Sequence, residues 1–364
     1  MSRTPWWERL QAQLRREWND LTTVNRSDRR WTMPFCAALA SGLPLLVGVW
    51  FGHIEFGLIS SIGGLVFLYL PETPLSHRMV LLLASAFAMC ACFALGLMSQ
   101  FLPGFHVLVL TFIAVLVSML CRFYQIAPPG SLFFVLAAAI GVYTPAEVLD
   151  VPLRVGLFTM GCLLACLIAF FYSLEALRQK PPQPIPPLAA ASFDFVIFDS
   201  IVIGGCVGIS LALARLFELD RPYWVPVSCL AVIQSLSLRA VWSKQLQRIL
   251  GTALGVVLAG ALLRLPLDPW SIAAMVMLLT FIVETMIVRH YGLAMIFTTP
   301  LTIFLADASY LGHAPTADLL EARLLDTVLG SLVGLIGGIG LYSPRFRQAL
   351  GRQIRRLTPA RLRD

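Results

Sequence analysis

Twelve apolar segments separated by short polar stretches constrain the fold of this chain more than any other feature of its sequence. The hydrocarbon core of a bilayer is about 30 Å thick, and a helix needs about 20 residues, or slightly fewer, to cross it. The segments run over roughly 31–52, 55–71, 79–100, 105–124, 129–145, 152–174, 194–217, 222–238, 248–264, 269–289, 291–308 and 320–342. The sequence therefore predicts an all-α integral membrane protein with about 12 transmembrane helices.

The composition agrees with a membrane protein. The chain is 58% hydrophobic and only 13% charged, whereas soluble domains carry roughly 25% charged residues. Its formal net charge of +7 does not call for a nucleic-acid partner, because the 27 Lys and Arg gather at the chain ends and in alternate loops. The eight cysteines lie almost entirely within apolar runs, which is typical of helix packing and not of disulfides or a zinc site.

The positions of the basic residues predict the orientation, because cytoplasmic loops collect Lys and Arg. With the N-terminus inside, the outer side holds only Arg154, Arg215, Arg221, Arg264 and Arg323. Both termini are therefore expected in the cytoplasm.

A proline-rich joint, Pro181-Pro-Gln-Pro-Ile-Pro-Pro187, cannot be helical and divides the spans into two sets of six. The predicted organisation is an arm (1–30), a first membrane half (31–174), a linker (175–192), a second membrane half (193–342) and a basic tail (343–364). The arm holds Trp6, Trp7 and Trp18 among its arginines. It can be an amphipathic segment on membrane lipids or a plain positively charged anchor. It does not resemble a cleavable signal peptide.

Residues at corresponding places predict that the two halves are parallel repeats. Ser118-Met-Leu-Cys-Arg122-Phe-Tyr124 aligns with Thr285-Met-Ile-Val-Arg289-His-Tyr291. Arg78 corresponds to Arg248, and Arg154 corresponds to Arg323. The three offsets of 167, 170 and 169 residues are nearly equal.

The paired arginines are candidates for an anion path. Arg78, Arg248, Arg122 and Arg289 would surround the inner mouth, and Arg154 and Arg323 the outer one. A guanidinium offers a planar fork that fits a carboxylate. The alternative is that each arginine extends to lipid headgroups and only sets the topology.

Asp199, Glu284 and Asp326 lie further inside the predicted spans. A carboxyl group in such a place can carry a proton, because burial raises its pKa toward the working pH. It can equally be a static ion-pair partner of Arg248, Arg289 or Arg323. Both interpretations remain open for all three.

Aromatic, proline and glycine positions complete the candidate path. Tyr223 and Trp224 open one span, where they fit an interfacial aromatic belt or ring stacking on a ligand. Phe297 and Thr298 precede Pro300, which is expected to interrupt its span. A short loop carrying Arg239 and Lys244 is expected before a helix that starts at Arg248. In that helix, Gly251, Thr252 and Gly255 recur at a spacing that lets another backbone or a ligand approach closely.

No enzyme chemistry is expected. The five histidines are scattered and form no metal cluster, and the chain lacks a phosphate-binding glycine loop or a nucleophile elbow. We therefore expect neither a metal nor a cofactor.

Three stretches resemble the fusaric acid resistance and aromatic acid exporter family of bacterial inner-membrane proteins. They are Arg221-Pro-Tyr223-Trp224, Gln247-Arg248-Ile-Leu-Gly251-Thr252-Ala-Leu-Gly255 and Ala322-Arg323-Leu-Leu-Asp326-Thr-Val-Leu-Gly330. The resemblance covers 193–342 and is weaker over 31–174, where His53-Ile-Glu55-Phe56-Gly57 replaces the Tyr-Trp opening. Family members have six-span modules, often duplicated, and are similar in architecture to plant aluminium-activated malate channels.

The resemblance implies a multi-pass protein of a bacterial inner membrane that exports aromatic or other organic acids. Together with the carboxylates inside the predicted spans, it leads us to expect a transporter that exports small organic, aromatic anions and is coupled to protons. A periplasmic adaptor or a second copy of the chain are possible partners. Two other functions remain open. One is a passive channel for organic anions, and the other is a membrane scaffold of an envelope assembly without transport activity.

Overall fold

The computed structural model describes residue 7 and residues 23–27, 29–187, 193–235, 237–307 and 316–357, and every regular element in these ranges is helical. The chain is thus an all-α protein, as predicted. Trp6, Trp18, most of the predicted arm, the end of the linker (188–192) and the end of the tail (358–364) lie outside the described residues.

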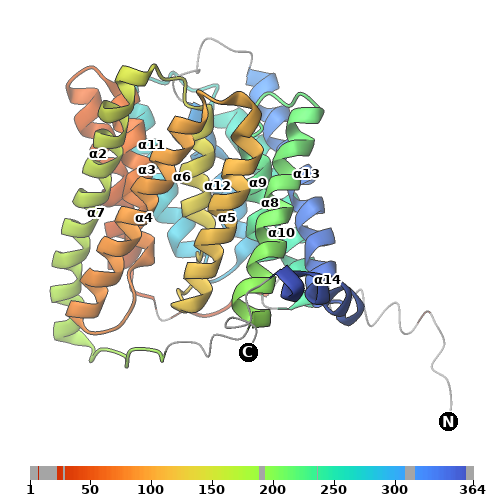
Figure 1. The fold of residues 1–364 in the computed structure, drawn as a ribbon. Helices are drawn as coiled ribbons and strands as arrows, with labels where there is room; N and C mark the ends of the chain where they lie inside the picture. The colour runs from red at the N-terminus through yellow and green to blue at the C-terminus, as the bar shows by residue number, and fades with distance from the viewer. Residues whose placement is uncertain are drawn as a thin grey trace.

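Figure 1 shows the helices side by side as a bundle. The first half contains α2 (Thr32–Trp50), α3 (Ile54–Gly64), η1 (Leu65–Tyr69), α4 (Leu75–Ser99), η2 (Pro103–Phe105), α5 (His106–Phe123), α6 (Leu132–Tyr143), η3 (Val148–Asp150) and α7 (Val151–Gln179). The second half contains η4 (Phe193–Phe198), α8 (Asp199–Leu216), α9 (Trp224–Ile233), α10 (Leu238–Leu262), α11 (Pro269–Met286), α12 (Tyr291–Asp307) and α13 (Thr316–Tyr342), followed by α14 (Pro344–Leu357).

Eight of these helices are long and apolar enough to cross a membrane. The other predicted spans hold shorter apolar helices, namely α3 with η1, α6, α9 and α12. At 1.5 Å per residue, the ten-residue α9 is about 15 Å long, which is half of a hydrocarbon core. The shorter helices take the second and fifth place in each half.

The shorter helices pack inside the bundle. All ten residues of α9 are buried. In the first half α4 packs on α6 and α3 on α7, and in the second half α10 packs on α12 and α9 on α13. The main hydrophobic core joins α2–α7 to α8 and α9. The long helices carry the exposed large apolar side chains, including those of Phe87, Phe112 and Val257.

The halves meet along two seams, one between α5 and α8 and the other between α2 and α11. Small residues allow the close approach at both. A methyl group added at Gly208 would overlap Thr111 in the α5–α8 seam, and one added at Gly42 would overlap Met277 in the α2–α11 seam.

Two local expectations from the sequence are wrong. Helix α10 begins at Leu238 with Ser237 as its N-cap, so Arg239 and Lys244 are helical and do not lie in a loop. Hydropathy places the start of this span at Arg248, the last charged residue before the apolar run. The helix itself begins earlier, in the polar stretch that precedes Arg248. In addition, α12 runs through Pro300 without interruption.

The bundle has one end at which residues 181–187 and α14 lie, which we call the linker end (Figure 1). Helix α14 lies across this end instead of continuing α13 (Figure 1). Residues 181–187 of the linker are not helical and are fixed to Glu72, whose backbone oxygen accepts a hydrogen bond from the Gln183 N–H at 2.9 Å.

Candidate functional site

Arg248 is buried between three helices of the second half, with only 6% of its surface exposed. Its Nη1 donates to the Tyr291 hydroxyl at 3.0 Å and to the Met295 sulfur at 3.5 Å. Its Nη2 donates to the Ser228 hydroxyl at 3.0 Å. Nε has no hydrogen-bond partner among the described residues. All the partners of this guanidinium in the described part of the chain are neutral.

The glycines that follow Arg248 hold these partners in place. A Cβ at Gly251 would lie 2.6 Å from the Gly292 oxygen, and one at Gly255 would lie 2.6 Å from the Ile296 oxygen. The missing side chains let α12 approach α10 closely, as the spacing predicted, and this brings Tyr291 toward Arg248. Thr252 is buried on the same helix.

Arg78, the predicted counterpart of Arg248, is also buried, at 5% exposure. It lies in the first turn of α4, and its Nε donates to the Thr73 oxygen at 2.6 Å. Its side chain is thus bonded to the loop that precedes its own helix. Arg78 and Arg248 therefore occupy corresponding positions in the two halves but have different surroundings.

Asp199, at the start of α8, makes ion pairs with two arginines of the described residues. Its Oδ2 lies 3.0 Å from Arg122 Nη1 on α5, and its Oδ1 lies 2.9 Å from Arg347 Nη1 on α14. The guanidinium of Arg122 also lies over the Phe195 ring, and that of Arg347 over the Phe198 ring. This cluster closes the linker end of the α5–α8 seam.

Glu284, on α11, pairs with Arg29 across the other seam. Arg29 Nη1 lies 3.1 Å from Glu284 Oε2 and also 3.1 Å from the Glu284 backbone oxygen. Ion pairing was one of the two interpretations for Asp199 and Glu284. The partners expected for them, Arg248 and Arg289, are wrong, because the packing of α5 on α8 and of α2 on α11 brings other arginines closer.

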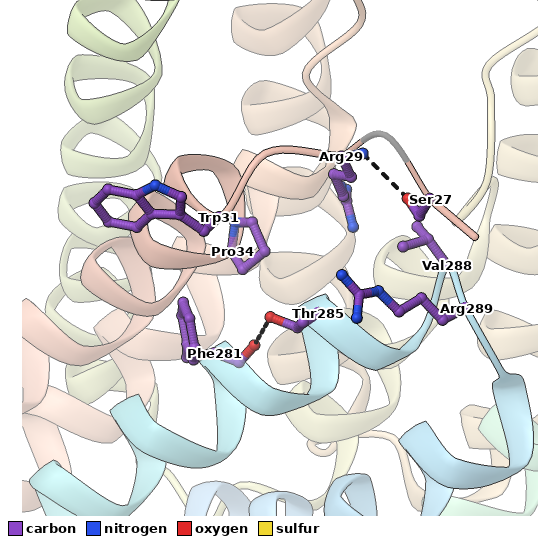
Figure 2. Close-up of a pocket in the computed structure, with 8 residues that line it drawn as sticks. All are labelled: Ser27, Arg29, Trp31, Pro34, Phe281, Thr285, Val288 and Arg289. Carbon is purple, nitrogen blue, oxygen red and sulfur yellow. Dashed lines mark hydrogen bonds between the residues drawn. The ribbon is translucent and has the colours of Figure 1, made fainter. Parts of the chain in front are cut away.

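A small cavity of about 70 Å³ lies at the linker end of the α2–α11 seam. Its lining consists of Ser27, Arg29, Trp31, Pro34, Phe281, Thr285, Val288 and Arg289. Figure 2 shows the side chains of Arg29 and Arg289 pointing toward one another. Arg289 makes no side-chain hydrogen bond or ion pair with a described residue.

Tyr223 and Trp224 are both buried, so an interfacial belt is the wrong description of their place. The guanidinium carbon of Arg323 lies 4.1 Å from the centre of the Trp224 ring. The Tyr223 ring lies 6.0 Å from that of Tyr143, which in turn lies 6.2 Å from His106. These residues form an aromatic row between the halves, at the end opposite to the linker end.

The remaining candidates are not among the described hydrogen-bond partners of Arg248. Phe297 packs on the apolar cluster formed by α2, α3, α11 and α12, and the Thr298 hydroxyl donates to the Ala294 oxygen at 2.8 Å. Asp326 is fully buried on α13, one turn after Arg323. Arg154 is half-buried near the start of α7.

Several residues of these sites were missed from the sequence. Ser228 and Met295 are of residue types that are common in membrane helices. For Arg29 and Arg347 the sequence indicates only a positive charge near each terminus. Tyr291 carried a weak signal, because it ends the stretch that aligns with Ser118–Tyr124. Within the ranges that the structure describes, no group of His, Cys, Asp and Glu is arranged to hold a metal ion.

Comparison with known proteins agrees with the motifs in the second half. Residues 209–337 match the family model described as fusaric acid resistance protein-like. The uncharacterized membrane protein YvaC of Bacillus subtilis is 25% identical over an alignment that covers 89% of this chain and 74% of the relative. The uncharacterized protein slr1298 of Synechocystis is 27% identical over 37% of this chain and 17% of its own length.

No solved structure matches the chain significantly. The family match includes Arg248, Gly251, Gly255, Tyr223 and Trp224. The resemblance to the fusaric acid resistance protein-like family that the motifs of the second half predict is thus confirmed over residues 209–337 of this membrane protein.

Proposed function

We propose that this protein is a transporter of the bacterial inner membrane that exports small organic, aromatic anions, and that Arg248 binds the anionic group of the cargo. The observation that carries the proposal is the buried guanidinium of Arg248, whose described partners are all neutral. The match of this half to the fusaric acid resistance protein-like family supports the class of cargo.

A buried charge with neutral partners is costly. Removing an ion from water carries a penalty of several kcal/mol even after relaxation, and hydrogen bonds to hydroxyl groups offset only part of it. A carboxylate would offset more, because it forms charge-assisted, two-pronged bonds with guanidinium. The Nε–H of Arg248 has no described acceptor and is available for one of these bonds.

The proposed transporter consists of two parallel six-helix halves with both termini in the cytoplasm. Corresponding helices pack on one another in the two halves, since the pair α4–α6 matches α10–α12 and the pair α3–α7 matches α9–α13. This agreement supports the repeat. So do the two seams, in each of which the fourth helix of one half packs on the first helix of the other. The arginines of α14 and of the segment before α2 support a cytoplasmic linker end.

The candidates for proton coupling are the three membrane carboxylates Asp199, Glu284 and Asp326. Asp199 and Glu284 form ion pairs with arginines, which is the static role that a buried carboxylate can have. These ion pairs favour a passive anion channel as the second candidate function.

Transport of radiolabelled benzoate into proteoliposomes tests the proposal. We expect Arg248→Gln to abolish most uptake, and Arg178→Gln to leave it unchanged, because the Arg178 side chain is 79% exposed in the last turn of α7. Uptake by Arg248→Gln at the wild-type rate would contradict the proposed site. A transport rate that does not depend on the pH gradient would favour the channel, whereas loss of the pH response in Asp199→Asn, Glu284→Gln or Asp326→Asn would support coupling.

A further inference from the structure

The cavity between Arg29 and Arg289 is a second place where an anion fits. We propose that it binds an oxyanion, carboxylate or phosphate, that is attached to an apolar body. The cavity lies at the linker end, where α2 begins and α11 ends, whereas the aromatic row lies at the opposite end. Its role as the entry site for the cargo rests on the proposed function, but the binding itself does not.

The arrangement of charge at the cavity favours the binding of an anion. The Arg29 and Arg289 side chains point toward one another (Figure 2), although like charges repel. Glu284 offsets this only in part, because it bonds Nη1 of Arg29 and makes no ion pair with Arg289. An oxyanion between the two guanidinium groups would bond both.

In the α5–α8 seam, a carboxylate of the protein itself lies between two arginines. Arg122 stands at the place that corresponds to Arg289, and there the Asp199 carboxylate contacts two arginines, Arg122 and Arg347. In the α2–α11 seam no described carboxylate contacts Arg289. A bound oxyanion would therefore supply to Arg289 the contact that Asp199 supplies to Arg122.

The walls of the cavity specify the rest of the ligand. One side carries the arginines and the Ser27 hydroxyl, which accepts from the Arg29 N–H at 3.2 Å and keeps its own hydrogen for a ligand. The other side is apolar and carries Trp31, Pro34 and Phe281 (Figure 2). A volume of about 70 Å³ holds an anionic group, and an attached ring or chain would extend over Trp31, which is 65% exposed.

The segment before α2 closes the cavity. The Asn25 N–H donates to the Arg289 oxygen at 2.9 Å, so this segment crosses the end of α11 and brings Arg29 and Ser27 to the cavity. The N-terminal region thus supplies part of a binding site as well as positive charge.

Two sources can provide such a ligand, a free organic acid or an anionic phospholipid. The experiment uses the full-length chain carrying Arg248→Gln, so that the buried site does not contribute. Benzoate binding is measured by calorimetry in nanodiscs of phosphatidylcholine, and retention of phosphatidylglycerol is measured by native mass spectrometry.

We expect Arg289→Gln, added to this background, to weaken binding of one of these probes about tenfold. Arg178→Gln should leave it unchanged. Loss of benzoate binding identifies a free acid as the ligand, and loss of phosphatidylglycerol retention identifies a lipid. Arg289→Lys should restore part of the affinity, because it keeps the charge but not the planar fork.

The proposal is overturned if the Arg248→Gln chain binds neither benzoate nor phosphatidylglycerol. It is also overturned if adding Arg289→Gln to that chain leaves its affinity for both probes unchanged. Misfolding is checked by the melting temperature, which should not fall, because Arg289 makes no side-chain bond to a described residue. The result is independent of the transport test at Arg248, so each proposal can fail alone.

Discussion

Arg78 and Arg248 occupy matching positions in the two halves, yet their surroundings differ. Arg78 lies in the first turn of α4 and bonds the Thr73 oxygen of the preceding loop. Arg248 lies ten residues into α10, about 15 Å from its start at 1.5 Å per residue. Its bonds reach α9 and α12.

The difference follows from the residues around each arginine. Gly251 and Gly255 follow Arg248 and admit α12, whereas Met79-Val-Leu-Leu-Leu-Ala follows Arg78. The comparison teaches that the helix pairs can be alike in both halves although Arg248 bonds neighbouring helices and Arg78 bonds the loop before its own helix. Three pairs of substitutions test this asymmetry.

The largest difference is expected between Arg248→Gln and Arg78→Gln. A charge-assisted hydrogen bond contributes about 1.5–3 kcal/mol, so loss of the cargo contact should slow benzoate transport roughly 10- to 100-fold. Arg78→Gln should slow it less than threefold, because Arg78 bonds only its own loop. Initial rates in proteoliposomes with matched protein content measure both, and equal losses would remove the asymmetry.

An intermediate effect on stability is expected for Gly255→Ala. The added methyl would lie 2.6 Å from the Ile296 oxygen, and overpacking of this kind costs about 1–3 kcal/mol. Gly205→Ala on α8 is the control, since its methyl would meet nothing within 4 Å. Melting in detergent should show a loss only for Gly255→Ala. An unchanged melting temperature would mean that α10 and α12 can separate without cost.

The smallest effect is expected for Tyr291→Phe, compared with Tyr124→Phe. The first substitution removes the hydroxyl that accepts from Arg248 and keeps the ring that faces Lys244. A net loss of about 1 kcal/mol in the free energy of benzoate binding corresponds to a roughly fivefold higher apparent Kd. Tyr124 is 54% exposed, and its substitution should change nothing. A matching loss in both variants would point to a general role of these tyrosines.

The sequence predicted the features that depend on local pattern. Hydropathy located a helix within every expected span, and the glycine spacing predicted the close contact of α10 with another helix. Where a helix begins was harder, because Ser237 and Arg239 are polar and still belong to the start of α10. Contacts between distant residues could not be predicted. Arg122 and Asp199 are 77 positions apart, and Arg29 and Glu284 are 255 apart.

The short interior helices also bear on how the membrane voltage acts on this molecule. A potential of 100 mV changes the energy of one elementary charge by about 2.3 kcal/mol. Helix α9 is about 15 Å long, so it accounts for only half of the distance over which a bilayer normally drops that voltage. If water reaches both ends of α9, a charge that moves past this helix would cross the whole membrane voltage within about 15 Å. The local electric field there would be about twice that across pure lipid.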